Sequence, residues 1–480
     1  MLDQFIPLLP EIYLAGLVLA ALVIGMFSKE ETAFKNTFVI ALTGLIGVFG
    51  ITLVSIPESD FAIQTLFLVK ETTESFYVTH PIAMLTKLLV ALCGIVLLLI
   101  SKPYLENRQL VKFEYNVLFL AAVLGAFVAL SSMNLLIIFI GLELLSFSTY
   151  ILVGFNRYST KAVKSANKYF IVGSISSALM LYGISLVYIT TGTVSYEVIA
   201  MHIAQTGISD LSFELYMALV LVASGLFFKI AIVPLQFYLR DVLYAANRPM
   251  LGFISTITKV VGLIVLFQML AVILPEEIPE LYFNMMLSFA LITIFIGSVT
   301  ALRENNINRL LAYSSINNAG FMLIGAALLN FEVTAIYVFN YCLIILAIVS
   351  FILSFKVKGE YIKTIQDLAF IAKKDKKFSF LGVMLIFTLA GVPPFMMFYA
   401  KFLIIQELVS SGFIISAVMA VVFSVFGAAY CLRVIKYIYL TPLNEDVSIQ
   451  IVTPTKVLTY ILALVVIAFS ILPDLLFKLI

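Results

Sequence analysis

The feature that most constrains this chain is a succession of apolar runs, each about 20 residues long or longer. A helix of that length crosses the hydrocarbon core of a bilayer, which is roughly 30 Å thick. We therefore predict an all-α polytopic membrane protein with about fourteen transmembrane helices. The predicted spans are 5–27, 36–56, 81–101, 115–131, 133–155, 166–190, 214–246, 250–274, 281–302, 308–329, 333–355, 378–412, 413–435 and 456–477.

The composition excludes several other classes of protein. Because 62% of the 480 residues are apolar and only 12% are charged, a soluble enzyme on a single anchor helix is excluded. A net charge of +2 does not indicate nucleic-acid binding. The cysteines and histidines are too few and too scattered for a zinc, haem or iron–sulfur site, so we expect redox chemistry only on partners. These residues are Cys93, Cys342, Cys431, His80 and His202.

Basic residues are distributed very unevenly between the two sides of the predicted membrane domain. Connections after the odd-numbered spans hold 23 of the 29 Lys and Arg residues. The opposite side holds only Lys70 and Lys478, although it includes the long segment 191–213. Because basic residues accumulate on the cytoplasmic or matrix side, we expect both termini on the periplasmic or intermembrane side.

Apart from the basic residues counted with the connections, four lysines lie inside predicted spans, namely Lys87, Lys229, Lys259 and Lys401. Lys87 is six residues from the start of its span, so its long side chain can reach the interface, and we favour that interpretation. Lys229 and Lys259 lie near the centres of their spans, where an ammonium group would remain in hydrocarbon. Ionisable residues at such depth usually face a bundle interior or a hydrated path.

Among the carboxylates, Glu143 alone lies near the middle of a span, whereas Glu11 and others lie near span ends and are expected to reach the headgroups. Glu143 could form a buried ion pair that fixes helix packing, or it could exchange protons. A lysine–glutamate pair whose separation changes is a proton switch, because the carboxylate favours the ammonium form. A single central carboxylate does not make an oxygen-rich cation site, so we expect protons rather than sodium.

Two predicted spans are too long for one straight crossing and contain proline internally. Pro234 lies in span 214–246, and Pro393 and Pro394 lie in span 378–412. Proline removes a backbone donor and clashes with the preceding turn, so both helices should break near a buried lysine. Broken helices in matching places of two halves indicate inverted repeats around an ion site. The predicted organisation is three N-terminal helices (1–110), a five-helix repeat (115–274), an inverted five-helix repeat (281–440) and a C-terminal helix (453–480).

At these charged residues the chain resembles a known family. The matching stretches include "LLPEIYLAGLVLAAL", "SSMNLLIIFIGLELLSFSTYILVGF", "FKIAIVPLQFY", "ITKVVG", "NINRLLAYSSINNAGFMLIG" and "LAGVPPFMMFYAKF", in order along nearly the whole chain. They resemble the antiporter-like membrane subunits of respiratory complex I, the proton-pumping NADH:quinone oxidoreductase. Among these the N-type, the counterpart of mitochondrial subunit 2, is the most similar. The L-type extends into a long lateral helix, and the M-type usually has glutamate where Lys401 stands.

The resemblance implies a function and a set of roles. Glu143 and Lys229 would be the ion pair of the first channel, Lys259 the central connecting lysine, and Lys401 the lysine of the second half-channel. The chain would translocate protons, driven by quinone reduction elsewhere in the complex. It would carry no cofactor itself, with NADH, FMN, iron–sulfur clusters and quinone on partner subunits. Its partners would be other membrane and peripheral subunits, including neighbouring antiporter-like subunits, in a bacterial cytoplasmic or mitochondrial inner membrane.

Two other functions stay open at this point. A sodium/proton antiporter subunit of the Mrp type or of a hydrogenase-linked complex would have a similar core. A structural spacer that no longer pumps is disfavoured, because its buried charges would be costly and idle. The chain also departs from the family: Gln236 and Asn318 stand where histidines are common, and Arg240 replaces a proline beside Asp241. A relay that needs imidazole at those points is therefore excluded here.

Overall fold

The computed structural model describes residues 8–55, 81–206, 212–274, 280–440 and 448–472. In this part of the chain, thirteen helices are long and apolar enough to cross a membrane. They confirm the predicted polytopic helical membrane protein. Lys70, Lys478 and His80, and the two chain ends whose sidedness was predicted, lie outside the described residues.

The chain forms two compact units. The first comprises Met1–Leu98, Leu110–Ile230 and Ile257–Tyr282, and the second comprises Leu99–Gln109, Ala231–Thr256 and Phe283–Ile480. The second half of the first predicted broken span therefore belongs to the second unit. The helix predicted at 250–274 is likewise divided between the units, near Thr256.

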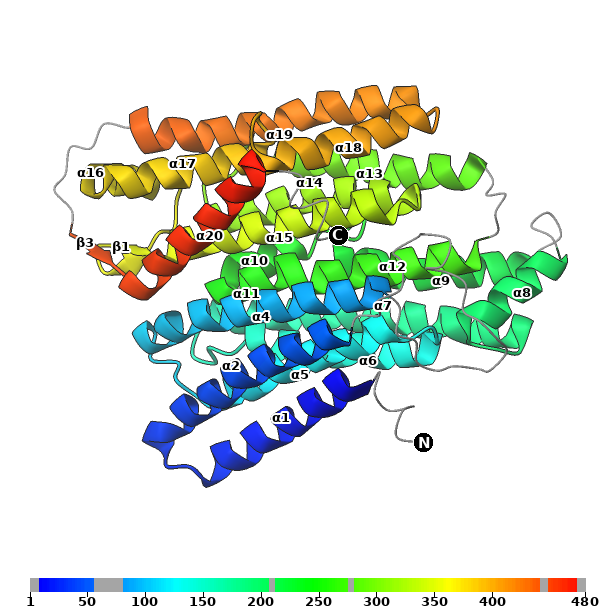
Figure 1. The fold of residues 1–480 in the computed structure, drawn as a ribbon, viewed down its shortest axis with the longest axis horizontal. Coiled ribbons are helices and arrows are strands. Elements are labelled where there is room, and N and C mark those ends of the chain that lie inside the picture. The colour runs from blue at the N-terminus through cyan, green and yellow to red at the C-terminus, as the bar shows by residue number, and fades with distance from the viewer. Residues whose placement is uncertain (1–7, 56–80, 207–211, 275–279, 441–447, 473–480) are drawn as a thin grey trace. The chain divides into compact units, whose positions relative to one another are not determined.

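Apart from the short α8 (Tyr196–Thr206), the helices of the first unit each coincide with or lie within one predicted span, give or take a few residues at their ends. They are α1 (Leu9–Phe27), α2 (Glu30–Val54), most of α4 (Pro81–Asn107), α5 (Glu114–Ser131), α6 (Leu135–Val153), α7 (Thr160–Thr191), α8 (Tyr196–Thr206), α9 (Phe213–Ile230) and α12 (Lys259–Ile273). In this unit α1, α2 and α5 run side by side (Figure 1). Helices α5 and α6 approach closely because a Cβ at Gly125 would lie 2.6 Å from the Gly141 carbonyl oxygen.

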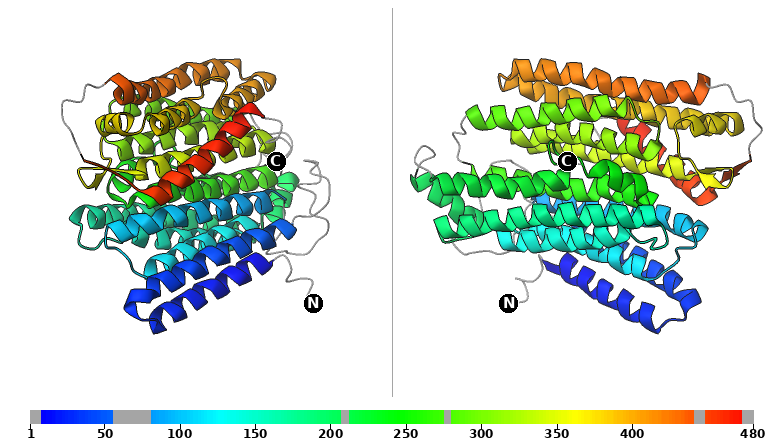
Figure 2. Two further views of the ribbon diagram at one scale, coloured as in Figure 1. Left: turned by 60° about the vertical axis from the view of Figure 1, so that its left-hand side comes forward. Right: turned by 180° about the vertical axis from the view of Figure 1, so that it is seen from behind.

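The second unit contains the remaining helices and a small sheet. Its elements are α10 (Leu239–Ala245), α11 (Arg248–Phe253), α13 (Glu280–Ala301), α14 (Ile307–Ala327), α15 (Phe331–Leu353), β1 (Phe355–Val357), β2 (Glu360–Tyr361), α16 (Ala369–Lys374), α17 (Lys376–Ala390), α18 (Met396–Ser410), α19 (Ile414–Leu440), β3 (Ile449–Ile451) and α20 (Thr453–Ile471). The strands are antiparallel in the order β2-β1-β3. Helices α17 and α18, drawn in gold, lie alongside the orange α19 (Figure 2).

The predicted span 378–412 breaks, as expected, into two helices of 15 residues each, α17 and α18. Two other local features were not predicted. The segment 191–213, which we expected to be a plain connection, contains α8. A π-helical turn, Ile254–Thr258, directly precedes α12. Hydropathy over a membrane-spanning length does not reveal short helices or π-turns, because these depend on the local backbone hydrogen-bond pattern and extend over few residues.

The second helix of each predicted repeat begins in the same way. The Asn134 side chain caps α6 by accepting from the Leu136 amide at 3.0 Å, and Asn306 caps α14 by accepting from the Asn308 amide at 3.0 Å. Asn134 also pairs in antiparallel fashion with Ser195, and Asn306 pairs with Thr364. In both cases the partner follows the third helix of the same predicted repeat.

Candidate proton-transfer site

Glu143 and Lys229 form a buried ion pair in the first unit. Glu143 lies on α6 and Lys229 in the last turn of α9, and their Oε1 and Nζ atoms are 3.3 Å apart. The side chains are 15% and 4% exposed, respectively. The geometry agrees with the pair that the sequence suggested, and it gives the lysine a counter-charge that partly offsets its loss of hydration.

Two serine hydroxyls complete this pair. Lys229 Nζ donates to Ser146 Oγ at 2.5 Å, and Ser177 Oγ donates to Glu143 Oε1 at 2.5 Å. Lys229 Nζ also lies 3.4 Å from the Leu142 carbonyl oxygen. A hydroxyl both donates and accepts hydrogen bonds. Ser177, Glu143, Lys229 and Ser146 are therefore connected by hydrogen bonds, so the ammonium group of Lys229 has proton acceptors beside it.

The helix that carries Lys229 ends directly after it. Helix α9 stops at Ile230, and helical structure resumes at Leu239 in α10. Pro234 lies in this interruption, preceded by a cis peptide bond, and Ala231 has a positive φ of 66°. The last carbonyls of a helix lack helical partners and carry partial negative charge. Lys229 thus stands at a helix end that favours a cation.

Lys259 is fully buried and is the first residue of α12. The π-helical turn Ile254–Thr258 immediately precedes it. Its helix packs against the end of α9, because a Cβ added at Gly262 would lie 3.3 Å from Cβ of Lys229. Lys229 and Lys259 therefore belong to two helices in direct contact within the first unit.

Lys401 lies on α18 in the second unit, facing the end of α17. Its Nζ donates to the Ala390 carbonyl, the last of α17, at 3.0 Å and lies 5.3 Å from the Phe321 ring centroid. Gly391, with a φ of 77°, ends α17, and a Cβ there would lie 3.0 Å from Cδ of Lys401. Pro393 and Pro394 follow in the interruption before α18. The lysine thus caps the negative end of a half-helix.

A family model described as NADH:quinone oxidoreductase/Mrp antiporter, transmembrane, matches residues 132–427. NADH-quinone oxidoreductase subunit N of Thioalkalivibrio sulfidiphilus is 32% identical over 485 aligned residues, covering 100% of this chain and 98% of the relative. The protein of the same name from Herminiimonas arsenicoxydans is 33% identical over 91% of this chain and 89% of the relative. This chain belongs to the subunit N family.

Solved structures show the same fold at lower identity. A chain of respiratory complex I from Thermus thermophilus superposes with a TM-score of 0.80 at 22% identity, covering 98% of each chain. A chain of the Mrp complex from Dietzia reaches a TM-score of 0.85 at 18% identity, covering 100% of this chain and 96% of that one. At such identities the likeness concerns the fold alone, so it does not separate the two complexes.

At two positions where the family resemblance led us to expect histidine, namely 236 and 318, this chain has amide side chains. Asn318 is fully buried on α14, where its Oδ1 accepts from the Tyr337 hydroxyl at 2.8 Å and its Nδ2 donates to the Ser314 carbonyl at 2.8 Å. Arg240, where the resemblance led us to expect proline, pairs with Glu304 at 3.2 Å. An amide does not titrate near neutral pH, so Asn318 can orient a proton path but cannot hold the proton.

The sequence interpretation of Lys87 and Glu11 is wrong. Neither reaches the headgroups: Lys87 is 0% and Glu11 5% exposed, and their Nζ and Oε1 atoms are 2.6 Å apart. The long lysine stem can bend toward a buried carboxylate as readily as toward the interface. The position of a lysine within a span therefore does not show whether its ammonium group lies at the interface or beside a buried carboxylate.

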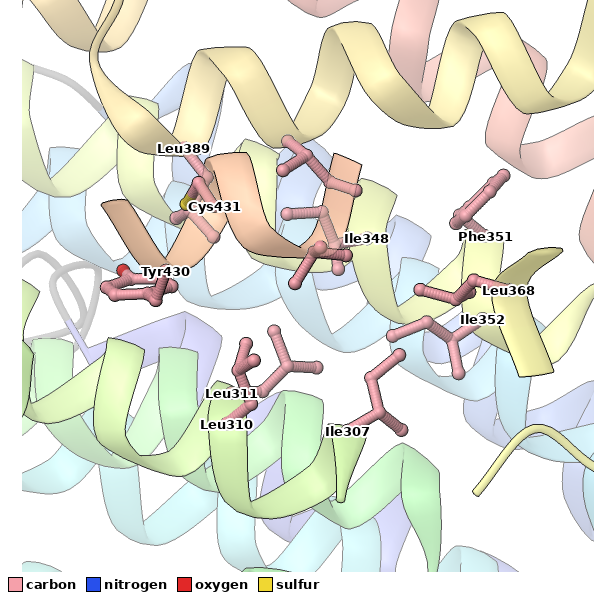
Figure 3. A pocket seen from close by; sticks show the side chains of 12 residues that line it. Ile307, Leu310, Leu311, Ile348, Phe351, Ile352, Leu368, Leu389, Tyr430 and Cys431 are labelled. Atoms are coloured by element: carbon pink, nitrogen blue, oxygen red, sulfur yellow. The ribbon is translucent and has the colours of Figure 1, made fainter. Parts of the chain in front are cut away.

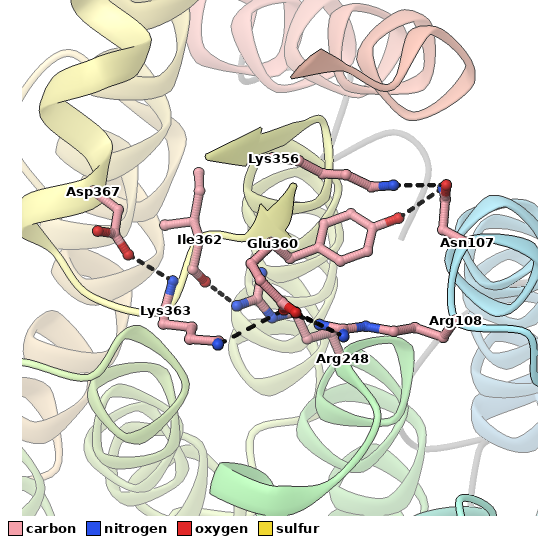
Figure 4. A network of polar contacts seen from close by, with 9 residues as sticks. Asn107, Arg108, Arg248, Lys356, Glu360, Ile362, Lys363 and Asp367 are labelled. Carbon is pink, nitrogen blue, oxygen red and sulfur yellow. Dashed lines mark hydrogen bonds and ion pairs between the residues drawn. The ribbon is translucent and has the colours of Figure 1, made fainter. Parts of the chain in front are cut away.

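Sequence reasoning also missed a polar network around Tyr361 in the second unit. The Arg108 and Arg248 guanidinium carbons lie 5.8 and 5.7 Å from the ring centroid, and Lys356 Nζ lies 5.2 Å from it. The Asn107 amide donates to the Tyr361 hydroxyl at 3.1 Å and accepts from Lys356 at 2.6 Å. The network joins the end of α4, the start of α11 and the β1–β2 hairpin (Figure 4).

Two further contacts hold this network together. Arg248 donates to the Ile362 carbonyl, and Arg108 pairs with Glu360 at 2.7 Å. The hydrogen bond from Arg108 lowers the pKa of Glu360 below its ordinary value. Because Arg248 begins the helical segment that leads to Lys259, these contacts anchor the start of that segment.

A small apolar cavity of about 30 Å³ lies between α14, α15, α17 and α19 of the second unit (Figure 3). Apart from Tyr430 and Cys431, its lining is entirely aliphatic or phenyl. The Tyr430 hydroxyl already bonds Ser314 at 2.8 Å. A buried water needs two to four polar partners, so this cavity offers no polar binding site.

Proposed function

We propose that this chain is a proton-translocating membrane subunit of NADH:quinone oxidoreductase. The observation that carries the proposal is the buried Glu143–Lys229 pair at a helix interruption, in a chain that matches subunit N relatives along its whole length. An ion pair in a membrane interior costs desolvation energy. If the distance between the two charges changes, the pair can bind and release a proton, which explains why such a costly pair is present.

The proposed switch works through the separation of the two head groups. While they stay close, the carboxylate of Glu143 keeps the proton on Lys229. When they move apart, the ammonium loses its counter-charge in a poorly solvated site and releases the proton. The interruption after Ile230 frees the lysine's helix end to move without disturbing a continuous helix.

Lys259 is the proposed next carrier, since its helix packs against the end of α9 at Gly262. Lys401 is proposed as the carrier of the second half, where the Ala390 carbonyl stabilises its ammonium form. In this role the lysines hold the exchanging protons, while Ser146 and Ser177 orient the path within the first unit and Asn318 orients it within the second.

We further propose that 115–274 and 281–440 are inverted repeats. The matched caps and bridges of Asn134 with Ser195 and Asn306 with Thr364 support this proposal, as do the fourth-helix interruptions. Five spans per repeat is an odd number, so the second repeat is inverted. We propose the same three N-terminal helices and single C-terminal helix as flanking parts, with both termini on the periplasmic or intermembrane side.

The chain is proposed to carry no redox centre of its own. NADH, FMN, iron–sulfur clusters and quinone would be bound by partner subunits, which supply the driving reaction. Among the described residues, no group of three or more His, Cys, Asp or Glu could hold a metal ion.

The alternative is a subunit of an Mrp-type or hydrogenase-linked sodium/proton antiporter. The curated sequence relatives favour the first function, because proteins named NADH-quinone oxidoreductase subunit N match this chain at 31–33% identity.

One experiment separates the two functions. The chain is purified with its partners in mild detergent, reconstituted into vesicles, and supplied with NADH and quinone. The proposal predicts copurifying NADH-dehydrogenase and quinone-site subunits and NADH-driven acidification of one compartment. Sodium-driven proton exchange, with no NADH-dependent transport, would support the antiporter instead.

A further inference from the structure

The first unit contains a second buried ion pair, formed by helices outside the proposed repeats. Glu11 lies in the first turn of α1 and Lys87 lies on α4. Their Oε1 and Nζ atoms are 2.6 Å apart, and both residues are more than nine-tenths buried. The proton path proposed above does not use this pair.

The surroundings of the pair reach into the first proposed repeat. The Ser131 hydroxyl, in the last residue of α5, donates to Glu11 Oε1 at 2.8 Å. Lys87 Nζ lies 5.8 Å from the ring centroid of Phe127 on the same helix. Glu11 Oε2 is buried, and it has no hydrogen-bond partner among the described residues. One carboxylate oxygen thus holds the ammonium and the other is available to take a proton.

The same set of groups occurs at both buried pairs. Each has a lysine ammonium, a glutamate Oε1 and a serine hydroxyl that donates to that oxygen: Ser131 to Glu11, and Ser177 to Glu143. A contact that only fixed helix packing could be made by apolar side chains of similar volume at no loss of stability. The repeated combination indicates proton chemistry at the second pair as well.

Helix α12 connects this pair with the proposed row of proton-carrying residues. Gln268 is buried on α12, and its Nε2 donates to the Leu130 carbonyl at 3.3 Å, one residue before Ser131. Its Oε1 has no hydrogen-bond partner among the described residues. Gln268 lies nine residues beyond Lys259 on the same helix, a rise of about 13.5 Å.

The four positions lie toward one face of the membrane. Counting alternate spans, α1 and α4 begin at the face where α5 and α12 end. Glu11, Lys87, Ser131 and Gln268 all lie within about two turns of those helix ends. The row from Lys259 through Gln268 to the second pair thus leads from the bilayer centre toward that face.

We propose that Glu11 and Lys87 form a proton-exchange site that connects Lys259 with the face of the membrane at which α1 begins. The inference rests on the proposed function. Lys87 passes its proton to Glu11, which leaves a neutral amine and a carboxylic acid. The acid releases that proton at the face, and the amine takes up another that originates from Lys259, on a path that the Gln268 amide and the Ser131 hydroxyl orient without holding the proton. One proton enters and one leaves, which restores the ion pair.

The decisive variant is Lys87→Arg in the complete NADH-oxidising complex, reconstituted in vesicles. A guanidinium keeps the ion pair with Glu11 but does not release its proton in proteins. We expect fewer protons translocated per electron than in wild type. Lys456→Arg is the matched control, because Lys456 pairs with Asp375 at 2.7 Å outside this row, and it should keep the wild-type ratio.

A second variant covers the case in which arginine does not fit. Glu11→Gln with Lys87→Gln replaces the ion pair by two amides that can still bond each other across the helices. We expect its proton-to-electron ratio to fall to the same value as that of Lys259→Ala, with no further loss when all three changes are combined, because the groups act in series.

The possible outcomes distinguish a failure of the proposed exchange site from a failure of the proposed function. Wild-type ratios in both variants at the second pair, with a reduced ratio in Lys259→Ala, would overturn the exchange site and leave the proposed function standing. A wild-type ratio in Lys259→Ala as well would contradict the proposed function itself. Ratios are compared per assembled complex, so a lower yield of complex alone does not mimic the effect.

Discussion

At the scale of single residues, each helix interruption brings a lysine to the carboxyl end of a half-helix. Lys229 occupies the last turn of α9, and Lys401 donates to the final carbonyl of α17. Sequence reasoning could locate these lysines because a charge in an apolar run is conspicuous. It could not identify the partner of Lys87, because Glu11 near a span end reads as an interfacial residue.

Replacements of Glu143 test the switch. Glu143→Gln removes the attraction that favours the ammonium form of Lys229, whereas Glu143→Asp keeps the charge and shortens its reach. We expect NADH-driven pumping to decrease in the order wild type, Asp, Gln at equal assembly. If Gln, the closer isostere, outperformed Asp, the role of Glu143 would be steric.

Gly391 tests the interruption next to Lys401. Gly391→Ala adds a Cβ that lies 3.0 Å from Cδ of Lys401, at a residue with a φ of 77°. The backbone conformation alone costs an L-residue about 1–2 kcal/mol. We expect a lower midpoint of thermal unfolding in detergent and weaker pumping. Ala231→Gly, which removes a Cβ at a positive φ in the other interruption, should change the midpoint little.

At the scale of elements, the long helices were predictable and the short ones were not. The predicted span 115–131 corresponds to Glu114–Ser131, and 133–155 to Leu135–Val153, because lipid requires uninterrupted apolar helices. Helix α8 and strands β1 to β3 lie in connections, where no bilayer enforces a length. The π-turn before Lys259 changes hydrogen bonding without changing hydropathy.

Asp375 tests how α17 is fixed. Its side chain accepts from the Phe378 amide at 3.0 Å as the N-cap of α17, and it pairs with Lys456 of α20 at 2.7 Å. Asp375→Ala loses both contacts and should cost about 1 kcal/mol or more through the cap. Asp375→Asn keeps a capping oxygen, so its unfolding midpoint should lie between wild type and Ala.

The same residue gives a pH dependence with a definite sign. The hydrogen bond from Lys456, helped by the Phe378 amide, lowers the pKa of Asp375. A lowered pKa in the folded state means that the carboxylate stabilises the protein above its ordinary pKa of about 3.9. This contribution should disappear as pH falls through the lowered value. Thermal unfolding from pH 6 to about 2.5 should therefore show a steeper acid loss in wild type than in Asp375→Asn.

At the scale of the whole molecule, the alternation of basic residues supports the predicted alternation of spans across the membrane, and the matched bridges at Asn134 and Asn306 support the proposed repeats. The charge pattern could be read from the sequence. The bridges could not, since each joins residues about 60 positions apart through backbone hydrogen bonds that any side chain could make.

Impermeant labelling tests the predicted sidedness. Lys358→Cys and Gln205→Cys place exposed thiols in connections predicted on opposite sides. The native cysteines Cys93, Cys342 and Cys431 are buried, so background labelling should be low. We expect each thiol to react with reagent from one side only, and from opposite sides. Reaction of both from the same side would contradict the fourteen-span topology.

The central claim is that buried lysines of this chain carry the translocated protons, and Lys401→Ala tests it most directly. The side chain is buried, and its ammonium bonds only a carbonyl among the contacts described above. Its removal should therefore leave the complex assembled. Protons translocated per electron are measured in vesicles that contain the variant or wild-type complex, with NADH as donor. We expect fewer protons per electron in Lys401→Ala than in wild type at equal assembly. An unchanged ratio would show that Lys401 carries none of the translocated protons.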